Sequence, residues 1–440
     1  MAGGTWTTQN KVRPGVYVDV STHSGAIGTV GDRGIAALAL VLSWGPAGEI
    51  ITVTPQTEVL KLLGYDWSHA SLLPVREALK RAGKLLVYRL NAGVKATATA
   101  GGVKATAVHG GIRGNDLAIV ISSNIEDETK FDIKTILQGA EVDRQTVSSA
   151  TELVANAFVS FEENGSEGLQ AAASIPLAGG SDGTVTNLDH SSFMSKLEVQ
   201  EFQTVGLLSG DNTLKSLYVS YVKRLRDTEG KKVQAVLADY AAADYEGAVS
   251  VKNGVILSDG TVVDKVNAVA WTAGATAAAA VNESLTYQAY DDAVDADIRL
   301  SHSETETALQ NGNLLFTYSG SKAVVEQDIN TLTSFTPDKG KVLSKNRVLR
   351  VLDAIAGDMK SIFESYFLGK VSNNEDGRAL FWSQCASYMS DLQDLGAIEN
   401  FNAQKDITVT AGRDGDSVVL EIAVQPVDSV EKVYMKVKVA

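Results

Sequence analysis

Residues 35–42 read Ile-Ala-Ala-Leu-Ala-Leu-Val-Leu, an apolar run without polar alternation. Such a run predicts a strand buried on both faces. The strongly apolar stretch ends by Trp44, far short of the roughly 20 residues that cross a bilayer. Residues 75–82 predict a short helix, and the strand Leu85–Leu90 follows. A strand, helix and strand in this order predict an α/β layer.

Length and composition limit what kind of protein this is. At roughly 150 residues per domain, 440 residues predict about three domains. Hydrophobic residues at 44% and charged residues at 21% are ordinary globular usage, which excludes a disordered or fibrous chain. The net charge of −14 disfavours binding to nucleic acid or anionic membranes, because phosphates would be repelled. We therefore expect protein partners.

Cysteine usage and the start of the chain bear on the compartment. A single cysteine, Cys385, excludes an internal disulfide and a cysteine metal cluster, and it fits a reducing environment. Residues 1–10 lack the charged start and the apolar core of a secretion signal. We expect synthesis and assembly in a cytoplasm.

The acidity is concentrated in the middle of the chain. Residues 94–182 hold 6 basic and 12 acidic side chains, and residues 183–335 hold 11 and 20. Residues 336–440 are nearly neutral, with 13 and 15. Glycine pairs and a proline near these limits predict turns or linkers: Gly101-Gly102, Gly110-Gly111, Gly179-Gly180 and Pro337 with Gly340.

The two middle segments differ in pattern. From residue 94 the sequence predicts short strands with glycine turns, including Leu117–Ile121, and Ser149-Ala-Thr-Glu152 is a capping-box pattern for a helix through Phe161. From residue 183 helix and strand alternate again. Asp211 is expected to cap a helix that ends at Gly230, and residues 233–237 follow as a strand.

The last hundred residues predict two helices and three strands. An amphipathic helix is expected over 344–368, ended by Gly369, and Asn374 is expected to cap a second helix that stops at Gly396. The strands are expected at 407–410, 418–424 and 430–439.

Motifs for common enzyme chemistry are missing. There is no P-loop, since Gly83-Lys84 lacks the upstream glycine and the hydroxyl ligand, and there is no Gly-x-Ser-x-Gly elbow or His-Glu-x-x-His helix. None of the five histidines is spaced with another histidine or the cysteine as zinc ligands would be. The acidic run of Asp291, Asp292, Asp295 and Asp297 lacks the glycine and the glutamate of a calcium loop, which favours a solvated loop.

One histidine segment invites comparison with a protease. His109-Gly-Gly is superficially similar to the histidine segment of subtilisin-type proteases, in which a histidine activates a serine. The nearest downstream string, Gly260-Thr-Val262, has valine where the nucleophile would be. This mismatch argues against a protease.

Both ends of the chain are strong strand formers. Val16, Val18 and Val20 share one face near the start, and Val433, Met435, Val437 and Val439 share one face at the end. Terminal segments fray unless they dock, so both need a sheet to join. They pair either within their own subunit or with neighbouring subunits, whose sheets a free strand can complete through main-chain hydrogen bonds.

Six segments together give the chain a family resemblance. They are Arg13-Pro-Gly-Val-Tyr-Val18, Ser43-Trp-Gly-Pro-Ala-Gly48, Val87-Tyr-Arg-Leu-Asn91 followed by Gly93 and Lys95-Ala96, Gly111-Ile-Arg-Gly-Asn-Asp116, Leu177-Ala-Gly-Gly-Ser-Asp-Gly183, and Asn330-Thr-Leu332. In this order and spacing, over nearly the whole chain, the sequence resembles contractile-tail sheath proteins. These occur in myophages, defective prophages and phage-tail-like bacteriocins of Gram-positive bacteria.

The resemblance implies a multidomain α/β fold. It implies an N-terminal arm (1–30), a subtilisin-like sheath core without protease chemistry (31–93 with 183–335), a β-rich outer insertion (94–182), and an α+β C-terminal domain that faces the tail tube (336–440). It implies that the terminal arms exchange strands with adjacent subunits. Val16, Val18, Val20, Val433, Met435, Val437 and Val439 are our candidates for that linkage.

The resemblance also implies a structural function and no cofactor. Subunits would polymerise as stacked hexameric rings around the tube and contract to drive it through the bacterial envelope. The expected partners are other copies of the chain, the tube protein, and baseplate and tail terminator proteins, in a virion tail or tail-like particle. A sheath of a related injection or secretion system is the nearest alternative, and a subtilisin-like serine hydrolase is the enzyme alternative.

Overall fold

The computed structural model describes residues 2–4, 15–17, 33–165 and 168–438. The chain forms two compact units. One, the core unit, contains the described residues of 32–353 together with those of 428–440. The other, the C-terminal unit, contains 354–427 together with residues 2–4 and 15–17. No helix among the described residues is long and apolar enough to span a membrane.

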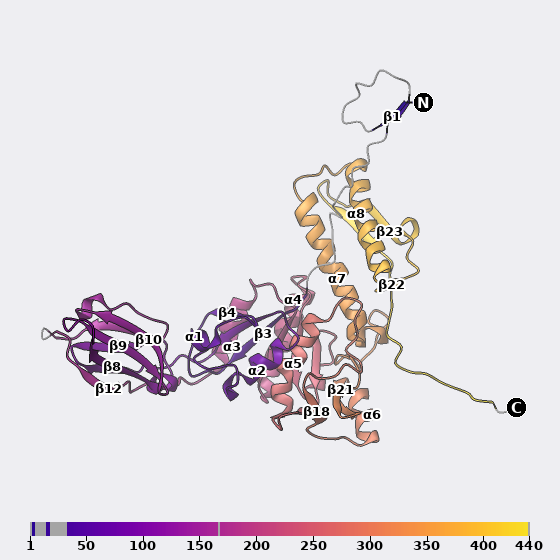
Figure 1. Ribbon diagram of the computed structural model, residues 1–440. Helices are drawn as coiled ribbons and strands as arrows, with labels where there is room; N and C mark the ends of the chain where they lie inside the picture. Colours follow the sequence, from indigo (N-terminus) through magenta and orange to yellow (C-terminus); the bar gives the residue numbers. More distant parts are fainter. Residues whose placement is uncertain (1, 5–14, 18–32, 166–167, 439–440) are drawn as a thin grey trace. The chain divides into compact units, whose positions relative to one another are not determined.

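A seven-stranded sheet forms the centre of the core unit (Figure 1). All neighbouring strands run parallel except the outermost pair, β4 and β5, which is antiparallel. In spatial order the strands are β19 (Asn313–Leu314), β15 (Ala248–Val251), β14 (Gln234–Ala238), β13 (Thr204–Leu207), β3 (Ile35–Leu40), β5 (Lys84–Arg89) and β4 (Ile50–Val53).

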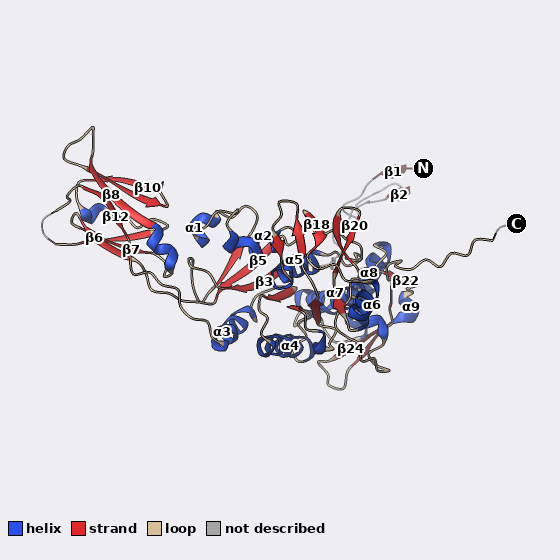
Figure 2. Ribbon diagram, turned by 90° about the horizontal axis from the view of Figure 1, so that it is seen from below, coloured by secondary structure: helices blue, strands red, loops and turns tan. Residues whose placement is uncertain are grey.

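The predicted strand at 35–42 is confirmed as β3, and it is buried on both faces. Ala36, Leu38 and Leu40 join one apolar core, while Ala37 and Ala39 join a second core on the opposite face. Helices close both sides, as Figure 2 shows. The first core holds α1 (Val59–Leu63), α2 (Leu73–Leu79) and α5 (Lys265–Ala278), and the second holds α3 (Asn187–Leu197) and α4 (Asn212–Asp227). The predicted α/β layer is thus present.

Local helix signals acted as expected in this unit. The Asp211 carboxylate accepts hydrogen bonds from the backbone amides of Thr213 (2.6 Å) and Leu214 (3.1 Å), so it caps α4. Gly230 follows the helix with φ of +72°, a conformation that glycine adopts easily.

The core unit also contains smaller elements. They are the 3-10 turns at 70–72, 112–116, 241–243 and 341–344, and the helix α6 (His302–Gln310). Three strands, β16 (Val255–Leu257), β17 (Val262–Val263) and β18 (Ala293–Ala296), form a small sheet, and β20 (Phe316–Ser319) and β21 (Lys322–Val325) form a hairpin.

Two antiparallel sheets are formed by the segment 97–176, which lies between β5 and α3 in sequence. They share one apolar core, which includes Ile119 and Val159, and so form a β-sandwich. One sheet contains β10 (Ala140–Val147), β9 (Phe131–Leu137), β8 (Leu117–Ser123) and β12 (Ala172–Pro176). The other contains β11 (Val159–Glu163), β7 (Val103–Ala107) and β6 (Thr97–Ala100).

The helix expected from Ser149 through Phe161 is wrong. Only a 3-10 turn forms, at Ala150–Glu152, and the Ser149 side chain caps nothing. The Asn156 carboxamide oxygen accepts hydrogen bonds from the amides of Phe158 (2.9 Å) and Val159 (2.8 Å), which turns the chain into β11. Pairing of β11 with β7 then buries both residues in the sandwich core, and this tertiary burial outweighs the local helix signal.

The sandwich is joined to the central sheet by two chain segments that lie side by side. Val94 pairs with Ser181, and Thr97 pairs with Ala178. Glycines allow the backbones to meet there. A Cβ on Gly93 would lie 2.3 Å from the Ser181 carbonyl oxygen, and one on Gly183 would lie 1.5 Å from that of Ala92. The Asp182 carboxylate accepts from the Ser43 hydroxyl (2.8 Å), which adds a polar contact at the same junction.

The C-terminal unit is built around a helix pair and a hairpin. Helix α7 (Asn346–Ile362) begins in the core unit and continues past residue 353 into the C-terminal unit. It ends in a π-helical turn, Phe363–Phe367, whereas the sequence predicts one long helix over 344–368. Asn374 caps α8 (Glu375–Asp394) as predicted. Phe363 and Phe367 pack on Phe381 with ring centroids 5.4 and 4.9 Å apart. The remaining elements are α9 (Ala403–Asp406), the hairpin of β23 (Ile407–Ala411) and β24 (Val418–Ile422), and the short pair β22 (Ile398–Glu399) and β25 (Gln425–Pro426).

The terminal strands are the last elements. β1 (Ala2–Gly4) and β2 (Gly15–Tyr17) pair in parallel. The strand expected at 430–439 is not formed in its described part, residues 430–438.

The close backbone contacts at the glycines between the sandwich and the central sheet can be tested by substitution. Gly111 has φ of +134°, and a Cβ there would lie 2.0 Å from the Ser43 carbonyl oxygen, so Gly111→Ala should lower the free energy of unfolding by about 3 kcal/mol or more. Gly139 is the matched control: its φ is +85°, but a Cβ added there would have no atom within 4 Å, so Gly139→Ala should cost about 1 kcal/mol. Urea unfolding measures both, and equal losses would contradict the steric explanation.

Candidate functional site

The C-terminal arm, residues 428–438, contains three of the residues predicted to exchange strands with neighbouring subunits, and their side chains are highly exposed. Val433, Met435 and Val437 are 77, 81 and 76% exposed, and Tyr434 between them is 92% exposed. No strand is assigned to residues 433–438, so their main-chain groups lack a ladder partner within the described chain. Strand-forming residues in this state offer both apolar surface and free backbone donors to another sheet.

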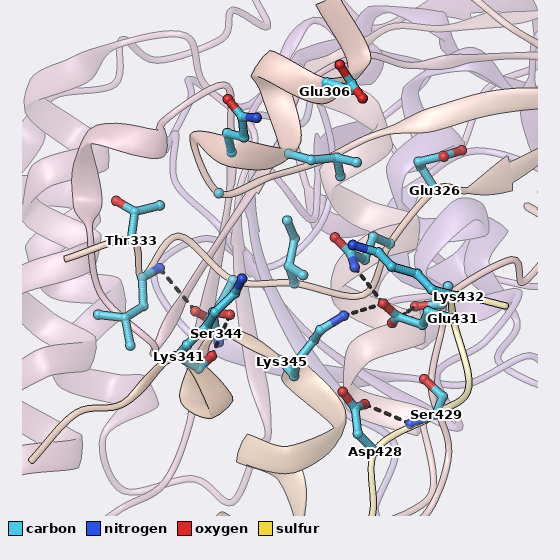
Figure 3. Close-up of a pocket in the computed structure, with 18 of the residues that line it drawn as sticks. Glu306, Glu326, Thr333, Lys341, Ser344, Lys345, Asp428, Ser429, Glu431 and Lys432 are labelled. Carbon is cyan, nitrogen blue, oxygen red and sulfur yellow. Dashed lines mark hydrogen bonds and ion pairs between the residues drawn. The ribbon is translucent and has the colours of Figure 1, made fainter. Parts of the chain in front are cut away.

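The base of this arm is fixed to the core unit by Glu431 (Figure 3). Its carboxylate accepts hydrogen bonds from the Thr286 hydroxyl (2.9 Å) and the Gln327 amide (2.5 Å), and it forms an ion pair with the Lys345 ammonium. The Glu431 and Lys345 side chains are only 11 and 19% exposed. Burial alone would raise the pKa of Glu431, but these donors and the lysine charge outweigh it and lower the pKa below its usual value.

A cleft of about 770 Å³ lies beside the arm base. Basic side chains line it together with acidic ones: Lys341, Lys345, Lys432, Glu306, Glu326, Asp428 and Glu431 (Figure 3). Because the lining carries both signs of charge, the cleft does not present the uniform charge that would hold a phosphate or a metal ion. Leu309, Ile329, Leu332 and Phe335 add apolar surface to the lining.

The N-terminal candidates are described only in part. Val16 lies in β2, where it is paired with Gly3 of β1. Val18 and Val20 lie outside the described residues, as does Val439 at the other end. The described structure therefore does not bring the two sets of candidates into one sheet.

A hairpin in the C-terminal unit has free edges. Within the described chain β23 and β24 pair only with each other, so each strand has one edge without a ladder partner. The hairpin packs on α8, and the Trp382 indole donates to the Ile407 carbonyl oxygen (3.2 Å). Val419 on β24 is exposed. A two-stranded hairpin is marginal alone, and added strands would complete its sheet.

The residues considered for enzyme or metal chemistry have structural roles. His109 packs edge-on against Trp44 with ring centroids 5.3 Å apart. Burial, followed by the charges of Arg89 and Lys95, lowers the pKa of His109 to about 4. Asp291 pairs with Arg81 (2.6 Å), and Asp295 pairs with Arg299 (2.6 Å). Across the described ranges no three His, Cys, Asp or Glu side chains are grouped as a metal site.

Sequence reasoning missed Glu431. A signal was available, because Glu431 falls in the same alternation phase as Val433 and Met435. A carboxylate in line with an apolar face is expected to have a specific partner.

Models of tail sheath domains match four consecutive parts of the chain. They are the Tail sheath protein Gp18 domain III N-terminal region at residues 33–90, the Phage tail sheath protein beta-sandwich domain at 91–182, the Phage tail sheath protein central domain at 183–331, and the Phage tail sheath C-terminal domain at 338–440. The chain is 40% identical to Phage-like element PBSX protein XkdK of Bacillus subtilis over the full length of both.

The chain belongs to the contractile phage tail sheath family. The crystal structure of the sheath tail protein of Desulfitobacterium hafniense is 50% identical, covers 97% of this chain and 100% of its own, and superposes with a TM-score of 0.87. The helical sheath of the anti-feeding prophage in its contracted state shares the fold, with 11% identity, coverage of 97% and 99%, and a TM-score of 0.57.

Membership of the family decides between the functional classes. Sheath proteins of this family are structural components of contractile tails and not enzymes, which removes the serine hydrolase alternative. The chain is a sheath protein of a phage or phage-like particle. The predicted multidomain architecture of mixed α and β content is confirmed, and its β-rich part is a β-sandwich.

The environment of His109 yields a pH prediction. Its pKa in the folded protein, about 4, is below the unfolded value near 6.5, so the unfolded chain binds more protons between these values. The neutral ring therefore contributes stability that is complete above pH 6.5 and declines as the pH falls toward 4. His109→Phe should make the melting temperature less dependent on pH in this window, with exposed His302→Phe as the control. An identical pH dependence of the melting temperature in wild type and His109→Phe would contradict it.

Proposed function

We propose that the chain polymerises as stacked hexameric rings around a tail tube and that its terminal arms join neighbouring subunits by strand exchange. The proposal rests on two segments whose backbone groups lack strand partners in the described chain. The C-terminal arm exposes strand-forming residues without a ladder partner, and the β23–β24 hairpin has free edges within the described chain. The arm of one subunit would pair with a free edge of the β23–β24 hairpin of another subunit through main-chain hydrogen bonds.

The seven candidate residues would form the apolar face of the exchanged strands. Val433, Met435 and Val437 alternate with Tyr434, Lys436 and Lys438, so one face could pack on the receiving unit while the other keeps its charges in solvent. Val16, Val18 and Val20 would serve the N-terminal arm, and Val439 would end the C-terminal strand. Burial of each large side chain would contribute about 1.5 to 3 kcal/mol.

We assign a role in the sheath to each domain predicted from the sequence. Residues 31–93 with 183–335 would form a subtilisin-like sheath core, 94–182 an outer β-rich insertion, 336–440 the tube-facing domain, and 1–30 the N-terminal arm. Other proposed partners are the tube protein and the baseplate and tail terminator proteins, with assembly in the host cytoplasm. The nearly neutral 336–440 segment suits a protein tube, which would separate the acidic remainder from any DNA.

Contraction would be a collective rearrangement that drives the tube through the bacterial envelope. The sheath would assemble in an extended, metastable state, and rings would rotate and widen while exchanged strands keep them connected. A gain of a few kcal/mol per subunit is large when coupled interfaces switch together. The shared fold with a contracted anti-feeding prophage sheath makes a related contractile injection or secretion system the second candidate setting.

Assembly of the purified protein tests the proposal directly. Wild-type protein should form striated tubes with a wide lumen in negative-stain electron microscopy. Deletion of residues 1–20 should leave a folded subunit that forms none, because an arm is missing and the central sheet begins only at Ile35. Circular dichroism checks the fold. Tubes of normal length from the deleted protein would overturn the role of the N-terminal arm.

A substitution in the other arm tests the strand itself. Met435→Pro removes one backbone donor, so it should abolish tube formation while leaving the melting temperature unchanged, since the residue is exposed and outside any strand of the described chain. Met435→Ala is the matched control: it shortens the side chain but keeps the donor, and it should only weaken assembly. Unaltered tubes from Met435→Pro would show that this segment is not shared.

A further inference from the structure

The C-terminal arm changes unit at its first residue. Val427 still belongs to the C-terminal unit, where its amide donates to the Ala397 carbonyl oxygen (2.9 Å). From Asp428 onward the chain belongs to the core unit. The segment that would be donated to a neighbour therefore starts from the core unit, although it follows the C-terminal unit in sequence.

The attachment at this point depends on one side chain. Within the described residues 428–438, the side-chain hydrogen bonds and ion pair that reach the rest of the core unit converge on the Glu431 carboxylate, from Thr286, Gln327 and Lys345. The partners come from three separate places: Thr286 precedes β18, Gln327 follows β21, and Lys345 precedes α7. A carboxylate held from three sides is fixed in direction as well as position.

The neighbouring arm residues do not share this attachment. The Asp428 carboxylate accepts from the adjacent Ser429 amide (2.8 Å), which is a local bond. Val430 is almost fully exposed, and the chain beyond Glu431 is exposed at Val433. The fixed part of the arm is therefore short, and it lies directly before the residues with strand-forming character.

We infer that Glu431 is a clamp that fixes the base of the C-terminal arm to the core unit and sets where the exchanged strand leaves the subunit. This inference rests on the proposed function, because it assigns the clamp to the same arm. A strand donated from a clamped base connects the core unit of one subunit to the hairpin of another. Tension in the arm would pass through the Glu431 carboxylate to Thr286, Gln327 and Lys345, which all belong to the core unit, and would bypass the link at Val427.

Backbone ¹⁵N relaxation of the full-length monomer tests the clamp without assembly. Glu431→Gln removes the charge but keeps the shape, and the order parameters of the amides of residues 430–432 should fall from about 0.85 to below about 0.6, because the buried pair with Lys345 is lost. Asp428→Asn is the matched control, since the Asp428 carboxylate accepts only from the Ser429 amide in the described chain, and it should leave the order parameters of residues 430–432 unchanged. The charge swap Glu431→Lys with Lys345→Glu should restore much of the order that either single change removes. Unchanged order parameters in Glu431→Gln would overturn the clamp.

Tube assembly tests its consequence. Glu431→Gln should raise the protein concentration needed for tubes about 5- to 20-fold, since a mobile base adds conformational freedom that assembly must remove. Lower order parameters with an unchanged assembly threshold would overturn the claim that the clamp directs the strand. A chain lacking residues 433–440 separates the two proposals: tubes from it would refute strand donation by this arm, while the relaxation measurement still decides whether Glu431 clamps the base.

Discussion

The burial of β3 on both faces is the constraint from which the core unit follows. A strand whose successive side chains enter two different cores needs a covering layer on each side, and α2 with α5 and α3 with α4 supply these layers. Parallel neighbours require crossover connections, so β3, β13, β14 and β15 are separated by helices or loops in sequence. The chain between β5 and α3, which is part of the connection from β3 to β13, forms the β-sandwich without interrupting the central sheet.

That insertion is tolerated because its two ends return to the same place. The segments at 94–97 and 178–181 pair with each other, and glycines allow their backbones and the neighbouring loops to approach. A domain connected through one chain segment can swing about it, whereas two segments that pair with each other resist bending and twisting. The sandwich is thus connected to the central sheet more firmly than a single chain segment would allow.

Sequence patterns predicted the parts of this structure whose causes are local. The caps at Asp211 and Asn374 were predictable because a side chain and the amides it binds lie within three residues. The helix at 149–161 was mispredicted because burial of Phe158 and Val159 in the sandwich, a tertiary effect, outweighs a local capping pattern. Glu431 was missed for a related reason: its partners lie 86, 104 and 145 residues away, and no local pattern encodes such distances.

The predicted strand at 430–439 is a different kind of discrepancy. Its alternation of apolar and polar residues is as regular as that of strands that do form, yet residues 433–438 remain outside every sheet of the described chain. A strand pattern specifies a requirement for a partner edge, and it does not specify which chain provides the edge. Under the proposed strand exchange, a regular strand pattern without a ladder and a hairpin with free edges are two parts of one sheet that forms only in the assembly. Selection on the assembled sheath would then maintain both the pattern and the open edge, since a subunit that satisfied its own hairpin would have nothing left to exchange.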